Sequence, residues 1–386
     1  MKYSTMRFRN GEDQVSLLGF GCMRFPKTES GAIDEEQAAG MLDAAIKAGV
    51  NYIDTAYPYH DGESEPFVGR VLASYPRDHF YLATKLPLWK VSTVQEAREV
   101  FEEQLDRLQV NYVDYYLFHG LNRERWNMLT GSGIIQWAEQ QKHDGKIRHL
   151  GFSFHDDYEV FREILTYRQW DFCQIQYNYM DRDIQAGDRG YKLAEKMGIP
   201  MIAMEPVKGG RLAGFPEDAA AVLKEAGPEA SLASWALRWV GTHPNVKVIL
   251  SGMSSMEQLE DNLKTFNTFV PLNKAEMEAV DQAASRIRMR IRNSCTACRY
   301  CMPCPEGVDI PGNFAIWNEG AMYGIEDKAK EAFLEKQQSG AGAEKCIRCG
   351  KCEQVCPQGI GIRGDLEIMA TELGEENEEE ENTAGE

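Results

Sequence analysis

The chain has 386 residues, of which 43% are hydrophobic, and a formal net charge of −18 at pH 7. Such an acidic chain is poorly suited to bind nucleic acid or an anionic membrane surface. Its apolar runs are shorter than the ~18 residues of a membrane-spanning helix. Residues 1–14 are polar and lack the apolar stretch of a secretion signal. We therefore expect a cytoplasmic protein with no nucleic-acid and no membrane partner.

Short strand-like segments alternate with segments of helical periodicity through residues 1–285. The strand-like segments are residues 17–21, 51–55, 80–84, 112–119, 147–153, 172–176, 201–204 and 247–250. Helical periodicity is found at residues 34–48, 94–108, 134–144, 187–197 and 230–240. Eight such repeats predict an α/β protein whose parallel strands close into a (β/α)8 TIM barrel. The Gly- and Pro-rich segment 205–217 follows the seventh strand, where barrel loops are commonly functional.

The remainder is expected to form a small second domain at residues 286–370 and an acidic, disordered tail at residues 371–386. A helix predicted at residues 273–292 leads away from the barrel and ends in four arginines, Arg286, Arg288, Arg290 and Arg292. They form either a solvated linker or a basic strip that docks the second domain. Disorder is expected of the tail because residues 375–386 contain seven Glu and no Lys or Arg.

Eight of the ten cysteines lie in two groups of four, each ending in Cys-Pro. The spacing is Cx2Cx2Cx2CP in the first group and Cx2Cx2Cx3CP in the second. In two-cluster ferredoxins the fourth cysteine, before the proline, binds the other cluster. We therefore predict two [4Fe–4S] clusters with crossed ligands. One is held by Cys295, Cys298, Cys301 and Cys356, and the other by Cys346, Cys349, Cys352 and Cys304.

Zinc and disulfide bonds are the alternatives for these cysteines. Structural zinc prefers two separated Cys pairs, and disulfide frameworks are typical of small secreted chains. The doubled motif resembles bacterial-type ferredoxins. The segment 314–336 between the groups favours a helix, which is more similar to the helical ferredoxin modules of multidomain reductases. We therefore expect a mainly helical, ferredoxin-like second domain.

Titratable residues follow three of the predicted strands, at the barrel face where chemistry takes place in such enzymes. Asp54, Tyr57 and Tyr59 follow the second strand, Lys85 ends the third and His119 ends the fourth. The motifs Ile-Asp-Thr-Ala-Tyr-Pro-Tyr (53–59), Ala-Thr-Lys (83–85) and Tyr-Tyr-Leu-Phe-His (115–119) stand in this order. With residues 145–153, 173–178 and 258–263, they resemble the aldo-keto reductase family. The cysteines make the chain similar to the iron–sulfur-containing branch of that family.

The resemblance implies a catalytic tetrad, and the chemistry of carbonyl reduction agrees with it. Hydride addition to a carbonyl leaves an alkoxide, which needs a proton donor within hydrogen-bond reach. Tyr59 would be that acid, although Tyr57 is a rival two residues away. Lys85 would lower the pKa of the Tyr59 hydroxyl, Asp54 would orient Lys85, and His119 would bind the substrate oxygen.

The resemblance also implies a nicotinamide site. Ser153 and Gln174 would bind the carboxamide, and Met204 stands where the family usually has a stacking Tyr. Further candidate cofactor contacts are Cys22, Glu205, Gly210, Gly252, Met253, Gln258 and Asn262. Residues 251–258 contain no Lys or Arg to pair with a 2′-phosphate, which argues against a strong preference for NADPH. NADH and a flavin nucleotide stay open.

Nicotinamide donates two electrons as a hydride, whereas each cluster passes one electron at a time, so their coupling requires a flavin or a similar converter. The leading hypothesis is an oxidoreductase that reduces a small carbonyl or conjugated compound and exchanges electrons with an external carrier through its clusters. One alternative is an electron-transfer or redox-sensing protein whose barrel binds a nucleotide without turnover, and another is an NADH-dependent reductase whose clusters are structural. The substrate pocket of the barrel is expected to have an aromatic lining, with Tyr57, Trp89, Leu121 and Trp126 as candidate residues.

Overall fold

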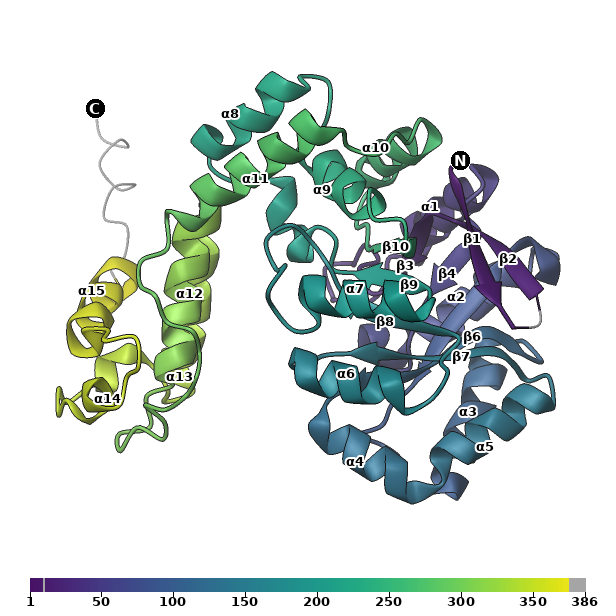
Figure 1. Cartoon of the computed structure of the whole chain (residues 1–386), viewed down its shortest axis with the longest axis horizontal. Coiled ribbons are helices and arrows are strands. Elements are labelled where there is room, and N and C mark those ends of the chain that lie inside the picture. Colours follow the sequence, from purple (N-terminus) through teal and green to yellow (C-terminus); the bar gives the residue numbers. More distant parts are fainter. Residues whose placement is uncertain (10, 375–386) are drawn as a thin grey trace. The chain divides into compact units, whose positions relative to one another are not determined.

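The structure, a computed structural model, describes residues 1–9 and 11–374 (Figure 1). Its centre is a closed barrel of eight parallel strands in the order β10-β3-β4-β5-β6-β7-β8-β9. These strands are β3 (Leu18–Gly21), β4 (Tyr52–Asp54), β5 (Tyr81–Leu86), β6 (Val113–Leu121), β7 (Ile147–Phe154), β8 (Phe172–Gln176), β9 (Met201–Met204) and β10 (Val246–Ser251). The predicted (β/α)8 barrel is confirmed, strand by strand.

Helices surround the barrel and return the chain to the start of each next strand (Figure 1). They are α1 (Glu35–Lys47), α2 (Ser64–Leu72), α3 (Val94–Leu108), α4 (Arg123–Ser132), α5 (Ile134–His143), α6 (Tyr158–Tyr167), α7 (Gly187–Met197), α9 (Leu232–Gly241) and α10 (Met256–Asn267). Local sequence sets their ends. The N-terminus of α3 has a capping box between Thr93 and Glu96, and its C-cap Gln109 is left-handed.

An antiparallel hairpin precedes the barrel, where the sequence predicts only a polar lead. Its strands are β1 (Tyr3–Phe8) and β2 (Gly11–Ser16). Met6 and Val15, both fully buried, belong to one core cluster with Tyr52, Tyr115 and other residues of the barrel strands. These strands begin at that end of the barrel, so the hairpin closes the end opposite the predicted catalytic residues.

A polar contact fixes the hairpin to the barrel. The Asp13 carboxylate accepts hydrogen bonds from Tyr115 Oη at 2.7 Å and from His149 Nε2 at 2.9 Å. The ring of Phe8 stacks on the His149 imidazole, with centroids 3.6 Å apart. Burial acts to raise the pKa of Asp13, but the hydrogen bonds from His149 and Tyr115 outweigh it and lower that pKa.

The chain divides into two compact units, of which the second comprises residues 214–228 and 281–386. The described part of this unit contains helix α8 (Glu217–Ala226) and the end of α11 (Lys274–Arg288), followed by α12 (Ile310–Tyr323), α13 (Glu326–Gln338), α14 (Lys351–Gln354) and α15 (Ile362–Gly374). Phe314, Phe333, Leu366 and Met369 are buried in its core. The expectation of a mainly helical domain is confirmed. One dividing point lies inside α11, after residue 280, whereas residues 214–228 also belong to this unit although they fall within the range 1–285 predicted for the barrel.

The arginines after residue 285 are largely exposed, and three of them have partners at the surface. Arg286 and Arg290 bind Asp218 of α8, and Arg292 pairs with Glu372 of α15. One expectation for this unit needs correction. The tail was expected to begin at residue 371, which is wrong for residues 371–374, since they complete α15. The rest of the predicted tail, residues 375–386, lies outside the described residues. In the described parts of the chain, no helix combines the length and apolar character needed to cross a membrane.

The Asp13 contact predicts a pH-dependent contribution to stability. Asp13→Asn should lower the free energy of unfolding at pH 7 by about 1–2 kcal/mol, because it removes a charge-assisted contact. A carboxyl group whose pKa is lowered by folding stabilises the fold above its unfolded pKa of about 3.9. That contribution is lost as the pH falls through the lower folded pKa, so the difference between variant and parent should shrink in acid. Urea titration followed by circular dichroism measures it.

Glu12→Gln is the matched control for this experiment. Glu12 lies on the same strand, is exposed and is 3.7 Å from Arg7, so its removal should change little. Equal losses in the two variants, or a loss in Asp13→Asn that does not depend on pH, would contradict the assignment.

Candidate active site and cysteine centres

The four residues of the predicted tetrad come together at the carboxyl ends of β4, β5 and β6. Lys85 Nζ donates to Asp54 Oδ1 at 2.6 Å, to the carbonyl of Thr55 at 2.8 Å and to Tyr59 Oη at 3.2 Å. Asp54 and Lys85 are buried, with side chains only 3% and 2% exposed. The His119 ring stands edge-on to the Tyr59 ring, with centroids 6.2 Å apart. The structure therefore places a hydroxyl, an ammonium and an imidazole around one point.

Burial dominates the electrostatics of this group. Burial acts to lower the pKa of Lys85, but Asp54 and Tyr59 outweigh it, so the pKa is raised and Lys85 stays an ammonium. Burial also raises the pKa of the Tyr59 hydroxyl, and the Lys85 charge offsets only part of that rise. The sequence predicts that Lys85 lowers the Tyr59 pKa. The charge of Lys85 does lower the pKa of Tyr59, but burial raises that pKa by more. Tyr59 therefore stays a protonated donor.

His119 is poised as a neutral hydrogen-bonding group. Burial, and then the positive charge of Lys85, holds the pKa of His119 well below its ordinary value. Its Nδ1 atom is buried and has no hydrogen-bond partner within the described residues. A buried polar atom without a partner costs free energy, which a ligand atom within hydrogen-bond reach would recover.

Two of the predicted nicotinamide contacts lie beside the tetrad. Gln174 of β8 donates from Nε2 to Asp54 Oδ2 at 3.3 Å, and its own Oε1 has no partner among the described residues. Ser153 of β7 accepts a hydrogen bond from the Gly120 amide at 2.7 Å. Gln174 therefore has one amide oxygen without a partner among the described residues, whereas the Ser153 hydroxyl already has a backbone partner, and neither residue borders the cavity beside the tetrad.

A cavity of about 280 Å³ runs from Asp54 and Tyr59 to the first turn of α10. Its lining includes seven of the predicted cofactor contacts, which are Met204, Glu205, Gly210, Gly252, Met253, Gln258 and Asn262. Gly210 belongs to the 3-10 turn Lys208–Ala213 in the long loop after β9. Cys22, also a candidate, is fully buried and does not line this cavity. The backbone amide of Cys22 instead donates to the Asp54 carbonyl.

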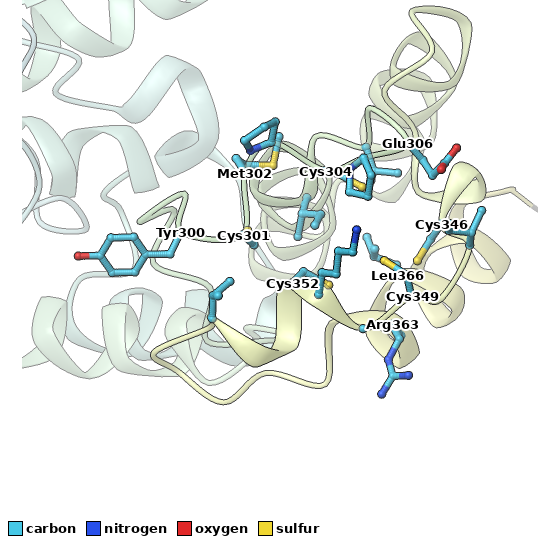
Figure 2. Close-up of a pocket in the computed structure, with 18 residues that line it drawn as sticks. Tyr300, Cys301, Met302, Cys304, Glu306, Cys346, Cys349, Cys352, Arg363 and Leu366 are labelled. Carbon is cyan, nitrogen blue, oxygen red and sulfur yellow. The ribbon is translucent and has the colours of Figure 1, made fainter.

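The eight clustered cysteines line two cavities in the second unit. Cys295, Cys298, Cys301 and Cys356 border one of them. Figure 2 shows the other, a cavity of about 210 Å³, with Cys304, Cys346, Cys349 and Cys352 around it. Cys301 also borders this second cavity. Burial, and then the neighbouring thiols of Cys295, Cys298 and Cys356, raises the pKa of Cys301. These two groupings match the crossed sets of cysteines that the sequence predicts, and the binding of a cluster by each set stays a prediction.

The thiols of each set border one common cavity. Within residues 1–9 and 11–374, no three His, Cys, Asp or Glu side chains are close enough to hold a single metal ion. Each set of four instead surrounds a space, as a cubane cluster requires. Four thiolates around one space are the donor set of a cubane cluster, so the residues present fit an iron–sulfur cluster.

Comparisons with known proteins agree with this geometry. The model of the aldo/keto reductase family matches residues 17–285, and that of the 4Fe-4S dicluster domain matches residues 294–360. The chain belongs to the aldo/keto reductase family. It is 27% identical over 284 residues to the uncharacterized oxidoreductase YqkF of Bacillus subtilis (strain 168), covering 66% of this chain and 88% of that protein. The protein is thus an oxidoreductase with a 4Fe-4S dicluster domain.

Other relatives have more specific descriptions. The NADH-specific methylglyoxal reductase of Escherichia coli (strain K12) is 25% identical over 286 residues, covering 62% of this chain and 85% of that protein. The holo form of aldo-keto reductase AKR11C1 from Bacillus halodurans has a TM-score of 0.61 and 26% identity, covering 73% and 96% of the two chains. A Klebsiella pneumoniae aldo/keto reductase in complex with NADP and acetate has a TM-score of 0.60 and 25% identity, covering 72% and 94%.

The structure reveals a cation of the aldo/keto reductase cavity that the sequence did not indicate. Arg24, in the loop after β3, lines the cavity together with Gly252 and Ser254. Its side chain crosses Gly252 so closely that a Cβ there would be 2.6 Å from Arg24 Cγ. The absence of Lys and Arg from residues 251–258 therefore does not leave this region without positive charge. Arg24 was missed because it is more than two hundred residues away along the chain.

The expected aromatic lining is partly wrong. Trp126 is buried beside Tyr167 and donates to Glu163, and Leu121 is buried within β6. Trp89 does lie at the tetrad, with its ring centroid 5.0 Å from that of His119. Tyr57, the rival acid, instead bonds to Glu103 at 3.1 Å and to Lys90 at 3.0 Å. The geometry thus favours Tyr59 over Tyr57 as the proton donor.

Paired removal of cysteines tests the crossed ligand sets. The Cys304→Ala/Cys346→Ala variant removes two ligands of one predicted cluster, so about four irons per chain should stay. The Cys301→Ala/Cys304→Ala variant removes one ligand from each cluster, so less than about four should stay. The measurement is iron and sulfide content after anaerobic purification, with about eight irons expected in the parent. Uncrossed ligation would reverse the order of the two variants.

Proposed function

We propose that this protein reduces the carbonyl group of a small molecule with a nicotinamide dinucleotide bound in the cavity beside the tetrad. The observation that carries the proposal is the hydrogen-bonded chain Asp54–Lys85–Tyr59, which ends in a protonated hydroxyl at the cavity wall. A carbonyl oxygen between Tyr59 and His119 would meet two hydrogen-bond donors. The methylglyoxal reductase and the NADP-bound structure among the relatives support this function.

The groups supplied from outside the chain are a nicotinamide, which gives a hydride, and the clusters, which carry single electrons. Tyr59 gives its proton to the carbonyl oxygen as that oxygen gains negative charge. Lys85 then stabilises the phenolate left behind, because its ammonium lies 3.2 Å from Tyr59 Oη. Asp54 keeps Lys85 in place, and Gln174 fixes the second oxygen of Asp54.

The nucleotide phosphates need positive charge, and Arg24 would supply it. Arg24 Nη2, Arg211 Nη1 and Glu205 Oε2 all lie within 3.8 Å of the position that a Cβ on Gly209 would occupy. Two guanidinium groups and one carboxylate therefore lie close to Gly209, in the loop that borders the cavity. This arrangement suits the pyrophosphate or the 2′-phosphate of the nucleotide.

The proposed role of the second unit is one-electron transfer through two [4Fe–4S] clusters with crossed ligands. The two cavities and their thiol sets support it. Because hydride chemistry and single-electron chemistry require a converter, the proposal includes an external one-electron carrier or a flavin as partner. Quantification of flavin beside iron after anaerobic purification distinguishes these two partners.

The acid role predicts different results for the two neighbouring tyrosines. Tyr59→Phe should lower kcat/KM for carbonyl reduction by about 10²- to 10⁴-fold, because it removes the proton donor. Tyr57→Phe is the matched control and should retain activity, since Tyr57 bonds to Glu103 on α3. The assay follows anaerobic oxidation of NADH or NADPH with a panel of small aldehydes that includes methylglyoxal. Equal losses in the two variants would overturn the assignment.

The phosphate role of Arg24 predicts weaker nucleotide binding without it. Arg24→Met should raise the dissociation constant by about 10- to 100-fold, because a charge-assisted contact is lost. Lys27→Met, an exposed change in the same loop, should leave it unchanged. Isothermal titration with NADH and with NADPH measures both constants. A loss confined to NADPH would identify the 2′-phosphate as the partner, and equal losses the pyrophosphate; unchanged constants would remove Arg24 from the site.

A further inference from the structure

Arg125 lies beside the tetrad and was not indicated by the sequence. It belongs to the first turn of α4, and its Nη1 donates to the carbonyl of Gly120 at 2.6 Å. Gly120 directly follows His119 and has a left-handed backbone with φ of +61°. A Cβ at Gly120 would be 2.8 Å from Arg125 Nη1. Glycine at this position therefore lets the guanidinium approach the backbone next to the catalytic histidine.

Trp89 connects Arg125 with His119. The Arg125 guanidinium lies over the Trp89 ring at 5.2 Å, and the Trp89 and His119 rings are 5.0 Å apart. The Arg125 charge is also one of the causes that lower the pKa of His119, after burial, Lys85 and His155. Arg125 is thus held by two contacts at a fixed place within electrostatic reach of the reacting centre.

Arg125 and Arg123 lie on the same turn of α4 but differ in their partners. No carboxylate is paired with it in residues 1–9 and 11–374, whereas Arg123 on the same turn bonds to Glu163. Glu205, the acid that acts on the neighbouring His155, lies by Gly209 together with Arg24 and Arg211. A partly buried guanidinium without a counterion is unfavourable. A negatively charged ligand at this place would offset that cost.

We propose that Arg125 recognises a carboxylate on the carbonyl substrate, so that the substrates are short aldehydes or ketones that carry a carboxylate group. The inference rests on the proposed carbonyl reduction at Tyr59 and adds its substrate class. A carboxylate fits the planar fork of a guanidinium. Arg125 brings one positive charge beside a neutral His119, which matches a monoanion better than a phosphate dianion. Trp89 would cover the apolar part of a short carbon chain.

The test compares two aldehydes that differ mainly in charge. 4-Oxobutanoate carries a carboxylate, and butanal has the same chain length without it. The parent enzyme should show a kcat/KM for 4-oxobutanoate at least about tenfold above that for butanal. Arg125→Met should remove this preference by lowering kcat/KM for 4-oxobutanoate about 10- to 100-fold while changing that for butanal little.

Arg123→Met is the matched control, since it removes a charge from the same turn of α4, and it should keep the preference. Should Arg125→Met fail to fold, Arg125→Lys replaces it, because that variant keeps the charge but loses the fork and should retain only part of the preference. A second readout, independent of turnover, is saturation-transfer NMR with the alcohol 4-hydroxybutanoate. It should bind to the parent and to Arg123→Met but not to Arg125→Met.

The outcomes separate the two proposals. Turnover of both aldehydes with equal kcat/KM, or equal losses for both in the Arg125 variants, overturns the carboxylate inference and leaves carbonyl reduction standing. If the parent turns over neither aldehyde and the wider panel of carbonyl compounds is also inert, the proposed function fails. Binding of 4-hydroxybutanoate that depends on Arg125 would still support the site in that case.

Discussion

The active-site face of the barrel depends on the buried ion pair between Asp54 and Lys85. Two charges with almost no solvent contact are stable only when they are paired and further hydrogen-bonded. Lys85 satisfies this condition with Asp54, the Thr55 carbonyl and Tyr59, and Gln174 binds the remaining oxygen of Asp54. These partners come from β4, β5 and β8. The site is therefore complete only when the barrel has closed and brought these strands together.

The sequence predicted the parts of the fold that depend on local pattern. Strand ends at Asp54, Lys85 and His119 follow from apolar runs bounded by polar residues, and parallel strands put those ends on one face. The hairpin of β1 and β2 was missed because its half-buried strands alternate polar and apolar residues weakly, and its burial comes from Tyr52 and Tyr115 far along the chain. Tertiary contacts of this kind leave no local signal.

In the functional sites, too, features set by local sequence could be predicted and features set by distant contacts could not. Cysteine spacing predicted the members of each group, and the fold brings Cys356 to the first group and Cys304 to the second. Arg24 and Arg125 could not be predicted in this way, because each acts at residues of another element. A signal existed in both cases, since Gly252 and Gly120 stand where a side chain would collide with an arginine. This signal can be interpreted only when each glycine and its arginine are known to lie close together.

Bulk charge and local charge lead to different conclusions about ligands. A net charge of −18 argues against polyanionic partners such as nucleic acid. Yet the described residues include two guanidinium groups near the tetrad or its cavity, those of Arg24 and Arg125, that form no ion pair with a described carboxylate. In an acidic protein, most Arg and Lys side chains find a carboxylate nearby, as Arg107 and Arg123 do. Arginines without such a carboxylate, as Arg24 and Arg125 are among the described residues, are therefore the candidates for binding an anionic ligand.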